Sequence, residues 1–457
     1  MIKMKNNYLR PLLALLMFTI VAVTAFQFSD SETLQLKKDA HIVLLGNNLG
    51  SRMMNYGHFE TEMQVRYPEN SLVIRNMSDG GDTPGFRPHS SRNLPWAFPG
   101  AEKFQTELAK NSNSEGHFDT PDQWLTRLKA DVIIAFFGYN ESFQGKEGLE
   151  NYKAELDAFI KHTLSQKYNG TSIPQLAIVS PIAFENLSKK FDLPDGKKEN
   201  VNLLLYANAM KEVAKKNKVL YVDAFTPYKK WFDTATAALT IDGSQLNSDG
   251  YLKFANLLSD QIFGKKAPVA EKNRKLVEVA VKEKNWMWHN DIKVPNGVHV
   301  YGRRYNPFGQ DNYPAEIEKI RQLTDIRDKA IWLAASKGET TDLALADKGT
   351  KVLPEVKTNY NPENNGSLKY LYGDEALKAL KVPAGYKIEL FASEEQFPEL
   401  AKPMQMTFDG KGRLWISTMP SYPHYKPGDS KPNDKIIILE DTNNDGKADK
   451  STIFAEG

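Results

Sequence analysis

The sequence predicts a three-layer α/β domain followed by a short all-β segment, and three observations support this. Between residues 40 and 265, short runs rich in Val, Ile and Leu alternate with longer segments of helical period. Such alternation is typical of a parallel sheet with helices on both faces. After Pro383 the apolar residues recur with a period of two, which favours strands. A length of 457 residues allows two or three domains.

The first domain is expected over residues 38–265 as five βα units. Its strand candidates lack strict polar alternation, so both of their faces should be buried. We expect these strands at His41–Leu45, Leu72–Arg75, Val132–Phe137, Leu176–Val179 and Val219–Val222. We expect the helices between them at Ser51–Tyr67, Leu149–Ser165, Asn202–Lys216 and Ser248–Phe263. Ser51 is a candidate N-cap for the first helix.

Residues 266–338 are predicted to form a helical appendage to this domain. Two charged helices, 271–284 and 315–336, flank a loop rich in aromatic side chains: Trp286, Trp288, Tyr301, Tyr305, Phe308 and Tyr313. Charge of this kind is usually a solvated face, and contact with another protein is the alternative. In residues 339–382 the periodicity fades into Gly, Asn, Thr and Lys, with turn signals at 359–362 and 364–366, which indicates a linker.

Residues 383–457 are predicted to begin a β domain. The expected strands are Tyr386–Phe391, Met404–Phe408, Arg413–Ser417 and Lys435–Glu440, with a hairpin turn at 409–412. Four strands are too few to close a barrel or a propeller without exposed edges. We therefore expect this segment to be the truncated start of a larger β structure.

The segment 441–449 carries oxygen-bearing side chains at nearly alternate positions, namely Asp441, Asn443, Asp445 and Asp449. Gly446 permits a sharp turn there, and the pattern is that of the first part of a calcium loop. Thr452 stands where an EF-hand needs a bidentate Glu, so an EF-hand is not expected. Two interpretations stay open: a looser calcium site, and a plain hairpin closed by Asp and Asn.

The composition excludes several classes of function. Apolar residues make up 41% and charged residues 25%, as in soluble globular proteins. The 59 Lys and Arg nearly balance the 57 Asp and Glu, so no basic field is available for nucleic acid, and no nucleic-acid partner is expected. The chain has no cysteine, which excludes disulfides, a thiol nucleophile, Cys-ligated zinc and a covalent haem site within these residues.

Residues 1–26 are predicted to be a signal peptide. Lys3, Lys5 and Arg10 precede an apolar run of about sixteen residues, and small side chains at 23–25 suit cleavage. The run is shorter than the roughly twenty residues that cross a bilayer. We expect export to the periplasm or the extracellular space, with an uncleaved N-terminal anchor as the alternative and no other membrane span.

Four loop segments follow the expected elements in order: Gly46-Asn47-Asn48-Leu49, Gly81-Asp82-Thr83, Gly138-Tyr139-Asn140-Glu141 and Asp242-Gly243-Ser244-Gln245. Together they resemble the sequence blocks of the SGNH (GDSL) hydrolases, a flavodoxin-like family of esterases and acylhydrolases. The resemblance implies that Asn48 stands at the nucleophile position and Gln245 at that of the catalytic histidine. It implies that Asp242 is the orienting carboxylate and that Gly81 and Asn140 donate to the oxyanion.

The chemistry of these residues is not that of an esterase. The nitrogen lone pair of the Asn48 amide is delocalised into its carbonyl, so it cannot replace a hydroxyl nucleophile. The carboxamide of Gln245 exchanges no proton near neutral pH and cannot act as a base. The amides that remain can donate and accept hydrogen bonds. We expect the domain to bind carbohydrate or an envelope component without hydrolysing it, and Tyr139 and His89 are candidates to add a ring face.

Two alternatives stay open for the first domain. The first is an active carbohydrate esterase with a rearranged site, in which Ser51 pairs with His89; His58 lies seven residues beyond Ser51. Against it, Ser51 is as readily a helix cap. The second is a structural or assembly module whose charged helices contact another protein.

The last segment has its own resemblance, carried by residues 385–392, 409–415 and 441–449. It is similar to the opening of the propellers in large secreted bacterial proteins described as membrane-bound dehydrogenases or haem-binding proteins, which in turn resemble soluble sugar dehydrogenases. In those proteins a degenerate SGNH-like domain often precedes the propeller. The resemblance implies that PQQ or haem, and any oxidoreductase chemistry, would lie beyond Gly457. No cofactor is expected in the first domain.

Overall fold

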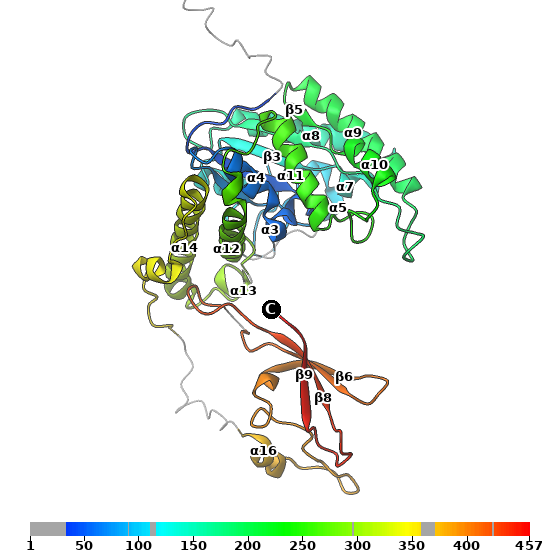
Figure 1. Cartoon of the computed structure of the whole chain (residues 1–457), viewed down its shortest axis with the longest axis vertical. Helices are drawn as coiled ribbons and strands as arrows, with labels where there is room; N and C mark the ends of the chain where they lie inside the picture. The colour runs from blue at the N-terminus through cyan, green and yellow to red at the C-terminus, as the bar shows by residue number, and fades with distance from the viewer. Residues whose placement is uncertain (1–32, 90, 110–115, 295–296, 358–370, 423–424) are drawn as a thin grey trace, which may run out of the picture.

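The computed structural model describes residues 33–457 except 90, 110–115, 295–296, 358–370 and 423–424 (Figure 1). The predicted signal peptide and the predicted turns at 359–362 and 364–366 therefore lie outside the described residues. Among the residues described, we find no helix with the length and apolar character needed to cross a membrane.

The first half of the chain is built on a five-stranded parallel sheet. Its strands lie in the order β2-β1-β3-β4-β5, which is the doubly wound order of flavodoxin-like folds. They are β1 (His41–Gly46), β2 (Val73–Asn76), β3 (Val132–Phe136), β4 (Gln175–Val179) and β5 (Leu220–Val222). Each boundary lies within one residue of its prediction, so the predicted parallel α/β fold is confirmed.

Alternate residues of β1 pack on opposite faces of this sheet. Ile42 and Leu44 join the cluster under α4 (His58–Arg66) and α11 (Ser248–Phe263). Val43 and Leu45 join the cluster on the other face, which is covered by α8 (Leu149–Ser165) and α9 (Lys197–Lys216). The predicted bounds of α8 and α11 match the structure, and α9 begins five residues earlier than expected. Shorter helices fill the connections: α5 (Thr106–Ala109), α6 (Pro121–Arg127), α7 (Tyr139–Ser142) and α10 (Phe225–Thr234).

The single helix predicted over Ser51–Tyr67 is wrong. Three helices replace it: α2 (Asn48–Ser51), α3 (Met53–Tyr56) and α4. Gly57 ends α3 with a φ of +70°, and a Cβ placed there would lie 2.9 Å from the Cγ1 atom of Val281. Ser51 is consequently not a helix N-cap. Asn47 caps α2 instead, because its Oδ1 accepts from the N–H of Leu49 at 3.1 Å.

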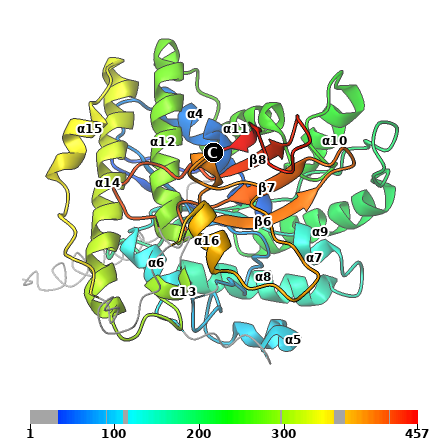
Figure 2. The ribbon, with the colours of Figure 1, turned by 90° about the horizontal axis from the view of Figure 1, so that it is seen from below.

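The helical appendage consists of α12 (Arg274–Ile292) and α14 (Gly309–Lys337), joined through α13 (Gly297–Val300). The two long helices lie side by side against α4 (Figures 1 and 2). Trp286 and Trp288 belong to α12, so the prediction that they lie in an aromatic loop is wrong. The Nε1 of Trp288 donates to the backbone oxygen of Asn76 at 2.8 Å, which ties α12 to the end of β2.

Charged side chains of the appendage are buried at this contact. Lys284 on α12 pairs with Glu60 on α4 at 2.6 Å, and Arg75 on β2 pairs with Asp328 on α14 at 2.5 Å. Burial raises the pKa of Glu60 and lowers the pKa of Lys284, so each side chain depends on the other to stay charged. The expectation of a wholly solvated charged face is therefore wrong for α12 and α14.

The last segment forms a four-stranded antiparallel sheet in the sequential order β6-β7-β8-β9 (Figure 1). The strands are β6 (Pro403–Phe408), β7 (Leu414–Thr418), β8 (Lys435–Glu440) and β9 (Lys450–Glu456). The predicted hairpin turn is present between β6 and β7, where the N–H of Asp409 donates to the oxygen of Arg413 at 3.0 Å.

The strand predicted at Tyr386–Phe391 is not formed, and β9 was not predicted. Residues 386–391 run beside the sheet without pairing as a strand, and Phe391 accepts one backbone bond, from Ala448 at 2.8 Å. The chain reverses through 441–449, which brings β9 against β8. In chain order, α15 (Leu343–Ala346) and α16 (Gly373–Ala379) come between α14 and β6.

Candidate functional site

The candidate site lies where β1 and β3 end, at the point where the chain order of the parallel sheet reverses. In open α/β sheets, ligands bind in the crevice beyond the carboxyl ends of the strands at this point. The chain turns tightly there because Gly46 has a φ of +116°, and a Cβ on it would lie 2.0 Å from the backbone oxygen of Phe136. Asn48 follows at once as the first residue of α2.

Three of the sequence-predicted residues form one chain of hydrogen bonds. The Nδ2 of Asn48 donates to the Oε1 of Gln245 at 3.2 Å. The Nε2 of Gln245 donates to the Oδ2 of Asp242 at 2.8 Å. Residues almost 200 positions apart in the sequence thus meet in the order in which the sequence analysis placed them.

Asp242 is held as a carboxylate by the loop that contains it. Its Oδ1 accepts from the backbone N–H groups of Ser244 (2.9 Å) and Gln245 (2.8 Å) and from the hydroxyl of Ser244 (3.0 Å). Burial alone would raise the pKa of Asp242, but these donors outweigh it and hold the pKa below its usual value. Asp242 therefore closes its loop and orients Gln245 at the same time.

The loops after β2 and β3 reach the same crevice. The Nδ2 of Asn140 donates to the backbone oxygen of Asp82 at 3.1 Å, beside the exposed Gly81. A Cβ built on Gly80 would lie 4.0 Å from the Oδ1 of Asn48. The two residues expected to donate to an oxyanion, Gly81 and Asn140, thus lie in loops that touch each other and adjoin Asn48.

A pocket that is open to solvent lies among these loops. Its walls include the amides of Asn48 and Gln245, the rings of Tyr139 and Tyr251, and the side chains of Arg52 and Ile182. Tyr139 was expected here, whereas Arg52 was not singled out by the sequence analysis. The signal that could have found Arg52 is its position four residues after Asn48, because residues four apart share one face of a helical segment.

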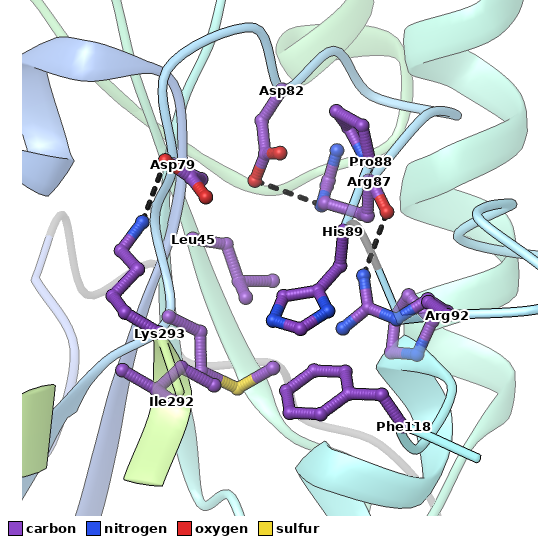
Figure 3. A pocket seen from close by; sticks show the side chains of 12 residues that line it. Leu45, Asp79, Asp82, Arg87, Pro88, His89, Arg92, Phe118, Ile292 and Lys293 are labelled. Atoms are coloured by element: carbon purple, nitrogen blue, oxygen red, sulfur yellow. Dashed lines mark hydrogen bonds and ion pairs between the residues drawn. The ribbon is translucent and has the colours of Figure 1, made fainter. Parts of the chain in front are cut away.

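Ser51 and His89, the candidate pair for a rearranged esterase, are not brought together. Neither lines the crevice pocket among the described residues, and His89 lines a second pocket beside it (Figure 3). His58 is engaged elsewhere, because its Nε2 lies 3.2 Å from the hydroxyl of Ser248. His89 consequently does not add a ring face to the crevice, and that expectation is wrong.

The second pocket is rich in charge, and two ion pairs lie among the residues that line it. Asp79 lies 2.6 Å from Lys293, and Asp82 lies 3.6 Å from Arg87 (Figure 3). Burial raises the pKa of Asp82 to about 7.

His89 stacks on Phe118 in this pocket with 3.8 Å between ring centroids. Burial and the nearby Arg92 lower the pKa of His89 to about 4. Its Nδ1 accepts from the N–H of Ser91 at 3.2 Å, so the neutral ring carries its proton on Nε2 and offers a donor rather than a base.

The loop predicted as a possible calcium site lies between β8 and β9. Asp441 accepts from the backbone N–H groups of Asp445 (3.2 Å) and Gly446 (2.8 Å), and Asn443 accepts from Asp445 at 2.9 Å. The carboxylate of Asp449 accepts from Thr442. Within the described part of the chain, no group of three or more His, Asp or Glu side chains is placed to hold a metal ion. The loop is closed by these bonds, and calcium binding stays a prediction.

The fold and the site together define a class: a flavodoxin-like α/β domain whose crevice holds two amides and a carboxylate in one hydrogen-bonded chain. A family model described as a domain of unknown function, DUF7133, matches residues 373–457. No curated protein matches the chain.

Solved structures that resemble the first half of the chain include hydrolases of low sequence identity. A protein described as a GDSL-like lipase from Parabacteroides merdae is 14% identical, covering 50% of this chain and 98% of its own, with a TM-score of 0.36. Axe2, an acetylxylan esterase from Geobacillus stearothermophilus, is 14% identical over 50% of this chain and 96% of its own, with a TM-score of 0.35. The fold class itself follows from the strand order of the parallel sheet.

Proposed function

We propose that residues 38–265 form an SGNH-like domain that binds carbohydrate, or an envelope component that carries it, without hydrolysing esters. The supporting observation is the direction of the hydrogen bonds. In a Ser-His-Asp triad the hydroxyl donates to the imidazole, which donates to the carboxylate. Here the amide of Asn48 donates to Gln245, which donates to Asp242. The donor order of a triad is kept, while the nucleophile and the titratable base are both absent from it.

The groups that line the crevice suit a sugar. Carboxamides both donate and accept, as hydroxyl groups require of their partners. Tyr139 and Tyr251 supply ring surface to the same pocket. The loops of Gly81 and Asn140 adjoin it and offer donors to a carbonyl such as that of an acetyl group. The domain therefore binds its ligand through the hydrogen-bonding groups of an esterase-like site that lacks the nucleophile and the base.

The test is an esterase assay on the full chain with p-nitrophenyl acetate and acetylated xylo-oligosaccharides. We expect no turnover above the uncatalysed background. The double variant Asn48→Ser with Gln245→His should gain measurable turnover, since Asp242 and the donors remain in place. Robust wild-type turnover that is lost in Ser51→Ala would contradict the proposal and establish the rearranged site.

For the antiparallel sheet we propose a blade of a β-propeller, in which any redox chemistry of the protein would reside. Blades are four-stranded antiparallel sheets that pack face to face around an axis. Met404, Met406 and Phe408 on β6 and Phe454 on β9 are all more than half exposed. Apolar side chains presented in this way support a sheet that packs against further β structure.

A further inference from the structure

The crevice holds a guanidinium group that has no ionic partner among the residues that the structure describes. Arg52 follows α2 and lines the pocket with Asn48 and Gln245. Its Nη2 donates to the hydroxyl of Tyr56 at 3.3 Å, and it lies beside the hydroxyl of Tyr251, so both neighbours are neutral. Its Nε is buried without a hydrogen-bond acceptor. Among the described residues, no carboxylate lies within ion-pair distance of Arg52.

The nearest carboxylate of the site does not balance this charge. Both carboxylate oxygens of Asp242 already accept hydrogen bonds. Oδ1 accepts three, and Oδ2 accepts one from Gln245. Gln245 stands between Asp242 and the pocket, so the carboxylate is not among the described residues that line it. Of those lining residues, Arg52 alone carries a full charge at neutral pH. The pocket therefore presents one positive charge beside neutral amides.

The second pocket, which contains His89, holds a charge cluster that can be compared with the crevice. There Lys293 pairs with Asp79, and Arg87 with Asp82 (Figure 3). Lys293 and Arg87 thus each have a carboxylate partner, and Arg92 donates to the backbone oxygens of Asp119 and Arg87. A half-buried arginine without such a partner, in a concave site lined by amides and rings, is instead suited to bind an anionic group of a ligand.

We propose that the crevice binds an acidic saccharide and that Arg52 holds the carboxylate of a uronic acid residue. This inference rests on the proposed carbohydrate-binding function and specifies its ligand. A guanidinium matches the planar carboxylate with paired N–H donors, and a single charge on the ligand balances the single charge of the pocket. Asn48 and Gln245 bind the hydroxyls of the same ring.

The test compares two ligands that differ in charge and in the methyl group that esterification adds to each carboxyl. The trisaccharide of galacturonic acid and its methyl ester are titrated into the full chain, with binding followed by calorimetry and by saturation-transfer NMR. We expect the acid to bind at least tenfold more tightly than the ester. Arg52→Gln should abolish this preference while the ester still binds, and Arg52→Lys should keep part of it. Arg303→Gln, which removes an exposed arginine outside the site, should change nothing.

The outcomes separate this inference from the function on which it rests. Equal binding of acid and ester to the wild type overturns the role of Arg52 and leaves carbohydrate binding in place. Tighter binding of galactose 6-sulfate than of galacturonic acid, compared as monosaccharides, overturns the choice of a carboxylate. Binding of neither trisaccharide overturns the proposal for a uronic acid, whereas the esterase assay separately tests the function on which it rests. Thermal unfolding of each variant shows whether a lost preference comes from a lost fold.

Discussion

The two sheets of this protein differ in how their side chains are covered. All five residues of the central strand β3 are buried, whereas all six residues of the edge strand β6 are exposed. Helices cover both faces of the parallel sheet, and a helical appendage is fixed to its β2 edge by buried ion pairs. The antiparallel sheet has one small cluster, around Leu414, Ile416 and Ile437. The first region therefore buries both faces of its sheet within its own chain segment, while the second leaves apolar surface that suits a further partner.

The largest effect should come from breaking a buried ion pair of the first region. Lys284→Ala leaves Glu60 buried without a partner and should lower the free energy of unfolding by about 3–5 kcal/mol. Urea unfolding followed by circular dichroism measures this. Lys282→Ala on the same helix removes an exposed pair with Glu278 and should cost at most about 1 kcal/mol. Similar losses in the two variants would show that the appendage is not anchored in this way.

The second region should be cut first by protease. We expect limited trypsin treatment of the full chain to release residues from 383–457 at least tenfold faster than it cleaves 40–265, because exposed strands open locally at low cost. Mass spectrometry of the fragments measures the two rates. If calcium binds at 441–449, its addition should slow cleavage within residues 383–457. A tail as resistant as the first domain would remove the contrast between the two regions.

A smaller, pH-dependent effect is expected at His89, beyond the end of β2. Because burial lowers its pKa in the folded chain to about 4, protonation favours the unfolded state. Its contribution to stability is present above its unfolded pKa and is lost as the pH falls toward 4. Between pH 7 and pH 5 the wild type should lose about 1–2 kcal/mol more than His89→Gln. Urea titrations of both proteins at the two pH values provide the check, and parallel losses would contradict it.

The smallest effect is expected on β6. Met406→Lys replaces a side chain that is 61% exposed, so unfolding should change by less than about 0.5 kcal/mol. Chemical denaturation of the full chain measures it. The matched substitution Ile437→Lys on β8, at a residue that is 0% exposed, should prevent the sheet from folding. A large loss from Met406→Lys would mean that β6 is covered in solution.

Much of the candidate site could be predicted from the sequence. Asn48, Asp242 and Gln245 were placed together because their segments follow the expected elements in a known order, and the structure joins them by hydrogen bonds. Arg52 could not be selected in the same way. An arginine between two short helices is usually solvated, and only the tertiary structure places the hydroxyls of Tyr56 and Tyr251 beside it, with no acid of the described residues at ion-pair distance.

The elements that could be predicted from the sequence are those with a clear pattern of apolar residues within the segment itself. The strands of the parallel sheet are continuous apolar runs, and α8 and α11 repeat apolar residues at helical spacing, so their bounds were predicted closely. Only the tertiary structure decided which surfaces meet. It broke the helix at Gly57, where Val281 of α12 approaches, and it turned Lys284 inward toward Glu60. It also paired β9 with β8 and left residues 386–391 outside the antiparallel sheet. The reason is physical: periodicity reports the conformation of a segment, whereas the partner that covers it is set by residues far away in the chain.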